Sequence, residues 1–151
     1  MIATTAAHKR TQWLLVALAK AGDRGLTAVQ MQKVLFLLGE RRKSSVGRYF
    51  YEFEPYNYGP FSRDVYDDAD RLLIDGAVEL DTSGGRSLRT YRLTERGKEF
   101  ALAAERDLPP EGVAYLAEVV PWVQSKTFTQ LVRAIYEAYP AMRENSVFQE
   151  S

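Results

Sequence analysis

The sequence contains no cysteine and only one histidine, His8. The absence of thiols excludes disulfides, zinc sites built on thiolates and cysteine nucleophiles. Acid–base enzymes most often use histidine, and the single imidazole of this chain lies beside Lys9 and Arg10. Serine–histidine–aspartate and cysteine–histidine catalytic arrangements are therefore not expected in this protein. We expect a protein that is not an enzyme and that holds no cofactor and no metal.

Long apolar runs are also missing, since none approaches the roughly 20 residues that a membrane-spanning helix needs. The longest run near the start, 13–19, follows basic residues, but Lys20 ends it and no small-residue cleavage site follows. An amphipathic helix explains this stretch better than a signal peptide does. We therefore place the protein in the cytoplasm and expect no membrane partner.

The chain lacks net charge as well, because 20 basic and 20 acidic side chains give a formal charge of zero. Proteins dedicated to nucleic acid are usually basic overall. Any nucleic-acid role must therefore come from a local excess of basic residues.

Apolar spacing and capping residues predict three helices in the first half of the chain. Apolar residues recur at helical intervals over 8–21. Thr27 and Gln30 form a capping box at the start of a second helix. Ser62 is a good cap for a third helix, and Gly76 is suited to end it.

The pattern between the second and third helices is irregular. Residues 41–45 are polar and charged, which indicates a solvated loop, and 50–53 suit a short strand. The segment 55–60 contains two prolines and a glycine, so we expect it to be irregular.

A hairpin is predicted after the third helix. Residues 77–80 and 88–93 alternate like strands on either side of a glycine-rich turn at 82–85. Thr94 then caps a fourth helix.

The carboxyl-terminal part is predicted to be helical. A short linker at 107–110 is followed by a helix that is kinked or split near Pro121. Thr127 and Gln130 form a second capping box before the last helix.

The expected fold class is mainly α with a small β-hairpin. A winged-helix-like core spans 8–106, and a C-terminal helical extension over 111–146 packs on it in one compact domain. The apolar faces of the last helices either complete this core or form a homodimer interface, and periodicity alone does not separate the two.

Several motifs resemble known families. The stretches 76–80 and 91–97, the second running Tyr-Arg-Leu-Thr-Glu-Arg-Gly, resemble the wing of bacterial winged-helix regulators. Residues 26–37 and 56–62 look like the SocA-type (Panacea) antitoxin domains and the related YwgA-like proteins, and 131–140 resembles the YwgA-like C-terminus. The resemblance implies a mostly helical fold and an antitoxin-like or regulatory role, exerted by binding another protein such as a cognate toxin. It offers no catalytic residues.

The predicted third helix, 62–75, argues against a conventional DNA reader. It contains two arginines and five aspartates, and each carboxylate brought to the phosphate backbone weakens binding. The loop before it is about 20 residues long, whereas a helix-turn-helix uses roughly 3–4.

Basic residues gather in two other places, the wing at 84–98 and the segment after the second helix. The candidate contact residues are basic side chains of these two groups together with two tyrosines: Arg41, Arg42, Lys43, Arg48, Tyr56, Tyr58, Arg86, Arg89, Arg92 and Arg96. A basic wing suits an acidic protein surface, or a minor groove or phosphate ridge of DNA. We favour a protein partner, and DNA binding through the wing is the alternative.

Two further features have alternative interpretations. The aromatic stretch 49–61 has two glutamates and no cation, so it repels phosphate, and packing of its rings in the core is favoured over a partner-binding surface. Asp64, Asp67 and Asp68 share a helix face and could hold Mg²⁺ or Mn²⁺. The acidity preferred at a helix N-terminus explains them more simply.

Overall fold

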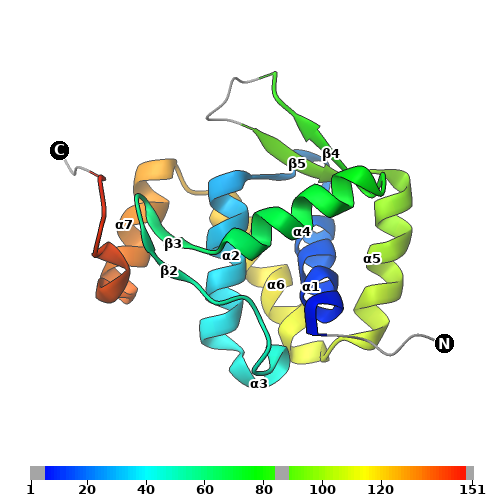
Figure 1. The fold of residues 1–151 in the computed structure, drawn as a ribbon, viewed down its shortest axis with the longest axis horizontal. Coiled ribbons are helices and arrows are strands. Elements are labelled where there is room, and N and C mark those ends of the chain that lie inside the picture. Colours follow the sequence, from blue (N-terminus) through cyan, green and yellow to red (C-terminus); the bar gives the residue numbers. More distant parts are fainter. Residues whose placement is uncertain (1–5, 84–88, 149–151) are drawn as a thin grey trace.

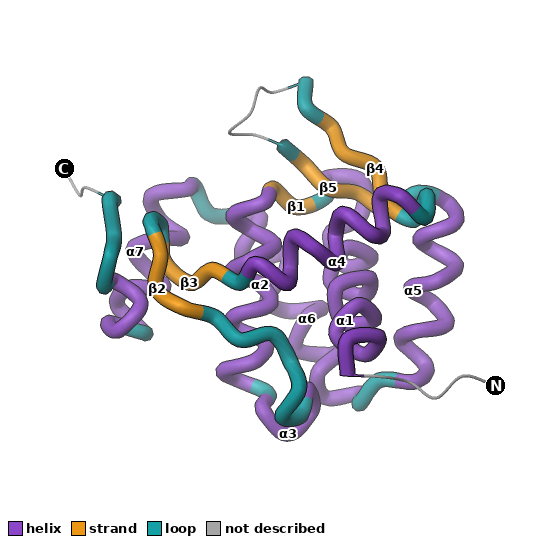
Figure 2. Tube along the Cα trace, in the orientation of Figure 1, coloured by secondary structure: helices purple, strands orange, loops and turns teal. Residues whose placement is uncertain are grey.

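The computed structural model describes residues 6–83 and 89–148, and in these ranges the chain forms seven α-helices and two small antiparallel sheets (Figures 1 and 2). The helices are α1 (Ala6–Ala21), α2 (Ala28–Arg41), α3 (Lys43–Val46), α4 (Arg63–Ile74), α5 (Glu95–Asp107), α6 (Pro110–Gln124) and α7 (Phe128–Ala138). The strands are β1 (Leu26–Thr27), β2 (Glu54–Tyr56), β3 (Gly59–Phe61), β4 (Val78–Asp81) and β5 (Thr90–Leu93), with 3₁₀ turns η1 (Gly22–Arg24) and η3 (Pro140–Arg143). The expected mainly helical chain with small antiparallel strands is confirmed. No helix within the described ranges is long and apolar enough to cross a membrane.

Helices α1 and α2 form the centre of the molecule. Every residue from 13 to 18 in α1 and from 31 to 38 in α2 is buried. A helix that is buried on all sides needs neighbours on all sides. Helices α5 and α6 pack against α1, α6 also packs against α2, and α4 crosses in front of α1 (Figure 1).

Local caps fix where several helices begin. The hydroxyl of Thr27 accepts a hydrogen bond from the backbone of Gln30 at 3.2 Å, and the Gln30 side chain accepts one from the Thr27 backbone at 2.9 Å. Thr127 and Gln130 form the same reciprocal pair at the start of α7. Thr94 caps α5 through its hydroxyl. Each of these caps is confirmed where the sequence predicts it.

Strand β5 is the centre of the first sheet, with β1 on one side and β4 on the other. The register places Glu79 opposite Arg92. Tyr91 and Leu93 are buried, so this side of β5 faces the core as the alternation predicts. Both predicted strands are present as β4 and β5, and residues 84–88, which include part of the predicted turn and the predicted start of the second strand, lie outside the described residues.

The loop predicted at 41–45 is wrong, because this segment is helical. Helix α2 continues to Arg41, and the backbone of Arg42 still donates to Leu38 at 2.9 Å. The short helix α3 then follows, packed on α2 and α6. Contacts with two other helices therefore override the polar composition from which a loop was expected.

The strand predicted at 50–53 and the irregular segment at 55–60 are also wrong. Residues 50–53 form no strand, and β2 and β3 form a hairpin across the prolines instead. Pro55 lies opposite Pro60 in the register. Proline cannot donate to a ladder, and adjacent antiparallel pairs alternate between bonded and non-bonded. The two prolines, which lack a backbone N–H, therefore form one non-bonded pair, and no hydrogen bond of the ladder is lost.

Helix α6 is neither split nor ended at Pro121. Proline removes the hydrogen bond to the carbonyl four residues earlier, which here belongs to Ala117. Ala117 is exposed, so water can satisfy that carbonyl. The helix then needs only three more residues to reach its end at Gln124.

The contact between α6 and α1 gives a test of this packing. A methyl group at Gly112 would overlap the ring of Trp13. We expect Gly112→Ala to lower the free energy of unfolding by about 1–3 kcal/mol, as overpacking does, even though alanine favours a helix by about 1 kcal/mol over glycine. Urea unfolding followed by circular dichroism measures the difference.

The control is Ala114→Gly on the exposed side of the same helix, which should lose about 1 kcal/mol through helix propensity alone. Unchanged or increased stability of Gly112→Ala would contradict the close approach of α6 to α1.

Candidate protein-interaction surface

The β2–β3 hairpin and the start of α4 present a row of aromatic rings. Tyr56 and Phe61 lie with ring centroids 4.9 Å apart, and Phe61 lies 5.5 Å from Tyr66 of α4. The side chain of Tyr56 is 49% exposed, and Phe61 and Tyr66 are half-buried. The row therefore presents ring surface to solvent instead of closing into the core.

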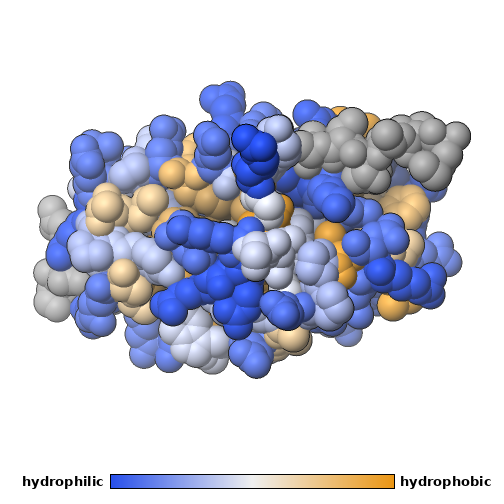
Figure 3. Space-filling view, turned by 90° about the horizontal axis from the view of Figure 1, so that it is seen from below, coloured by the Kyte–Doolittle hydropathy of each residue, from blue (hydrophilic) through white to orange (hydrophobic). Residues whose placement is uncertain are grey.

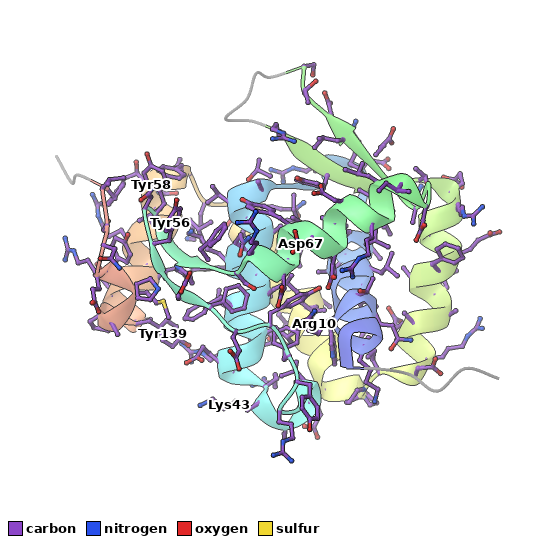
Figure 4. All side chains as sticks on the ribbon, viewed as in Figure 1. Arg10, Lys43, Tyr56, Tyr58, Asp67 and Tyr139 are labelled. Atoms are coloured by element: carbon purple, nitrogen blue, oxygen red, sulfur yellow. The ribbon has the colours of Figure 1, made fainter. Side chains whose placement is uncertain are left out.

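A second group of rings begins on the other side of the hairpin turn. Tyr58 contacts Phe128 of α7 at 5.2 Å, and both side chains are more than 40% exposed. Figure 4 shows Tyr56 and Tyr58 together on the hairpin. We name the two groups together the hairpin aromatic surface, defined by Tyr56, Tyr58, Phe61, Tyr66 and Phe128.

Hydrogen bonds fix the hairpin at both ends. The buried side chain of Gln32 donates to the carbonyl of Ser62 and accepts from the amide of Ser62, both at 2.9 Å. At the turn, the carbonyl of Asn57 accepts a hydrogen bond from the backbone of Val147 at 2.9 Å. The hairpin that bears the aromatic surface is thus held by hydrogen bonds of the chain itself. Ser62 lies at the predicted cap position of α4, but its side chain makes no capping bond.

A lysine is buried beneath the hairpin. Lys33 of α2 is 2% exposed, and its Nζ lies 3.6 Å from the position that a Cβ on Gly59 would take. Among the described residues, no ion pair or hydrogen bond involves this ammonium group. Burial lowers the pKa of Lys33 from 10.5 to about 8.

Two of the three aspartates weighed as a metal site, Asp64 and Asp68, are paired within the chain. Asp68 is buried, and its carboxylate accepts a hydrogen bond from the hydroxyl of Tyr51 at 2.7 Å and one from Arg71 at 2.9 Å. Arg10 of α1 donates to Asp64 at 3.0 Å. No three acidic or histidine side chains of the described ranges are grouped so that they could hold a metal ion.

Arg10 completes this polar cluster by lying over an aromatic ring. Its guanidinium is 4.9 Å from the ring centre of Tyr51 and 4.0 Å from the carboxylate of Asp68. Burial and the neighbouring Asp68 raise the pKa of Tyr51 well above its ordinary value, so the hydroxyl remains a donor. The cluster links α1, α4 and the segment before the hairpin.

The outer side of α4 is acidic. Asp67 and Asp70 are exposed, and neither forms an ion pair within the described part of the chain (Figure 4 for Asp67). Glu54 of β2 is exposed as well and lies opposite Phe61 in the ladder. The nearest cations are Arg71, which follows Asp70 and pairs with Asp68, Arg63, which begins α4, and Arg89 before β5.

The first predicted basic group lies on a different face. Figure 3 shows hydrophilic residues at the centre of the face that contains α3, and Figure 4 shows Lys43 on that face, away from Tyr56. Arg41 donates to the hydroxyl of Tyr139 at 2.8 Å. Arg42 lies over Tyr115, and Arg48 over Tyr49. Except for Lys43, these cations are engaged by tyrosines of the chain itself.

The predicted basic wing presents less charge than its sequence indicates. Arg92 is bound by Asp81 at 3.2 Å and lies 3.8 Å from Glu79 across the hairpin. Lys98 pairs with Glu95 at 2.8 Å. In the described parts of 78–98, four cations stand against three carboxylates.

The other wing arginines differ in their surroundings. Arg96 lies over the ring of Phe100, and Arg89 is exposed. Arg86 lies outside the described residues. The candidate contact residues thus occupy three separate places, which are the α3 face, the wing and the hairpin.

The aromatic stretch 49–61 divides between core and surface. Phe50 and Tyr51 are buried, as core packing predicts, whereas Tyr49, Tyr56 and Tyr58 are exposed. Tyr66 and Phe128 were not among the predicted site residues. Tyr66 falls beside the apolar stripe of α4, which is a usable signal. For Phe128, just after a helix cap, we find no sequence signal.

The Gln32 bonds give a prediction for the hairpin. Gln32→Leu leaves the buried N–H of Ser62 without a partner, which costs about 1–3 kcal/mol, whereas the Ser62 carbonyl keeps the hydrogen bond from the backbone of Val65. We expect lower stability to urea and faster amide hydrogen exchange in β2 and β3. The control is Gln12→Leu, because the side-chain oxygen of Gln12 is buried without a partner in the described structure, and its removal should not destabilise. Equal exchange rates in both variants would contradict the role of Gln32.

Lys33 gives a pH-dependent prediction. Between about pH 8 and 10.5 the unfolded chain keeps a proton that folded Lys33 has lost, so wild-type stability rises with pH across this window. Lys33→Met should therefore be more stable than wild type at pH 7, by up to about 3 kcal/mol. The advantage should shrink toward about pH 10, as urea unfolding at both pH values would show. If Lys33→Met is less stable than wild type at pH 7, or if the stability difference between them does not change with pH, Lys33 is not buried without a partner.

Comparison with family models, with curated proteins and with solved structures gives no match for this chain. The resemblance to SocA-type antitoxins therefore remains a matter of the motifs alone.

Proposed function

We propose that the chain is a cytoplasmic, non-catalytic regulatory module that binds another protein through the hairpin aromatic surface. The observation on which this rests is a row of partly exposed rings on a hairpin that Gln32 and Val147 hold in place. Rigid, exposed tyrosines supply contact area at little cost in side-chain entropy.

The order of elements supports a winged-helix identity for the core. Helices α1, α2 and α4 precede the β4–β5 hairpin, and β1 adds a third strand to it. Together with the motifs shared with SocA-type antitoxins, this arrangement supports an antitoxin-like role with a toxin as the partner. A fold does not by itself specify a function, so the choice between a protein and DNA as the partner depends on the residues of the surface.

DNA binding through the wing is the alternative, and the charges of the structure disfavour it. In a winged helix, α4 would occupy the position of the helix that enters the major groove. Asp67 and Asp70 are exposed on that helix, and they would meet phosphate. Arg92 of the wing is already paired with Asp81.

Replacing one exposed ring tests the protein-binding proposal. We expect Tyr56→Ser to weaken recovery of a specific protein from the native cell extract by about tenfold or more, since an aromatic anchor contributes about 2 kcal/mol. The recovered protein is then purified, and its affinity for both forms is measured by calorimetry. Phe100→Ser is the control, because Phe100 is a comparably exposed ring on α5, away from the hairpin.

Equal loss in the two variants, or no loss in either, would refute the proposed surface. Titration of mixed duplex DNA at low and high salt separates the alternative. Affinity that falls steeply with salt and falls again in Arg89→Glu would favour DNA, whereas we expect no measurable binding.

A further inference from the structure

We infer that the tip of the β2–β3 hairpin, residues 55–60, is a cover over Lys33 that opens while the rest of the chain stays folded, and that a proton on Lys33 favours the open state. This inference concerns a conformational change of the chain itself. It goes beyond the proposed function and does not depend on it.

Lys33 lies beneath the tip, where β3 and α7 meet. It is 2% exposed, and its Nζ is 3.6 Å from the position that a Cβ on Gly59 would take. The same position is 3.5 Å from the ring of Tyr136 and 3.9 Å from the side chain of Ile135, both on α7. No described residue forms an ion pair or a hydrogen bond with the ammonium group. An ammonium group that is buried without a partner has lost its hydration, and access to water restores it.

Charged groups on the elements around Lys33 do not compensate for this burial. The titratable side chains of the hairpin and of α7 are Glu54, Tyr56, Tyr58, Arg133, Tyr136 and Glu137. Neither these nor other charged groups of the described chain contribute to the pKa of Lys33, which burial lowers from 10.5 to about 8. In the open state the pKa returns to that of a solvated lysine, so opening takes up a proton between about pH 8 and 10.5. The closed state therefore gains stability over the open state as the pH rises through this window.

The base of the hairpin is held on α2. The ring of Phe53 contacts the ring of Phe36 with centroids 5.6 Å apart, and the backbone of Ser62 is hydrogen-bonded to the side chain of Gln32. Phe36 and Gln32 are both buried. The base therefore stays in place when the tip moves, and the opening hinges there.

The tip is held more weakly than the base. Gly59 and Pro60 are its buried residues, and neither carries a large side chain. The ring of Tyr58 contacts α7 but remains 42% exposed. The carbonyl of Asn57 accepts a hydrogen bond from the backbone of Val147 at 2.9 Å, and water can replace this bond at a small net cost. Segments with few buried apolar contacts open at the lowest free energy, which favours the tip as the part that moves.

Opening also rearranges the hairpin aromatic surface. Tyr56 and Tyr58 belong to the tip, whereas their ring partners Phe61 and Phe128 do not. Movement of the tip therefore separates these rings. A ligand of the assembled rings binds the closed state and opposes opening.

The test is amide hydrogen exchange of the full chain, followed by NMR at pH 7 and pH 9 in wild type and Lys33→Met. The amides of Tyr56 and Gly59 report on the tip, because the register pairs them beside the non-bonded prolines. Buried amides of α1 report on global unfolding. In wild type, we expect the tip amides to be less protected than those of α1. Between pH 7 and pH 9 their protection factors should rise about tenfold in wild type and stay constant in Lys33→Met.

The matched control is Lys9→Met, which replaces an exposed lysine of α1 and should keep the tenfold rise of wild type. Equal protection of the tip and of α1 in wild type would overturn the local opening. The same pH dependence in wild type and Lys33→Met, or its loss in Lys9→Met, would overturn the role of Lys33. If Lys33→Met does not fold, wild type alone decides, because tip protection factors that do not change with pH contradict the inference.

Discussion

The position of the hairpin, and with it of α4, depends on the side-chain amide of Gln32. An amide offers a donor and an acceptor side by side, so it can pair with both backbone groups of one residue, here Ser62. Ser62 is buried, and its N–H would otherwise stay unpaired between the end of β3 and the start of α4, whereas its C=O also accepts from the backbone of Val65. Because α2 is buried over 31–38, the hairpin is anchored to a helix at the centre of the core.

This anchoring explains why exposed rings can coexist with a fixed loop. The segment 47–53 has no regular structure, yet Tyr51 is buried and donates to Asp68 of α4. Arg10 lies over Tyr51 and ties α1 to the same place. Polar bonds on both sides of the hairpin therefore add to the packing of Phe50 and Tyr51 in the core, and the rings of Tyr56 and Tyr58 remain partly exposed to solvent.

Ion pairs within the chain determine how much unpaired charge each part of the surface presents. The wing is basic as a stretch of sequence, but Asp81 and Glu79 lie across from Arg92 and offset its charge. The acidic helix α4 loses Asp64 and Asp68 to arginines, while Asp67 and Asp70 stay unpaired within the described structure. The charge that a surface presents is what remains after such pairing, and on α4 the unpaired carboxylates in the described structure are those of Asp67 and Asp70, which lie on the same helix as exposed Arg63.

The sequence by itself determined the elements that depend on neighbours in the chain. The capping boxes at Thr27 and Thr127, and the hydroxyl cap at Thr94, involve residues three positions apart, so their bonds form wherever the helix forms. Only the tertiary structure decided the rest. The register that sets Pro55 opposite Pro60 joins residues across a turn, and the bond between Gln32 and Ser62 joins residues 30 positions apart. Such pairings depend on which surfaces meet once the core has formed, and the spacing of residues along the chain does not reveal them.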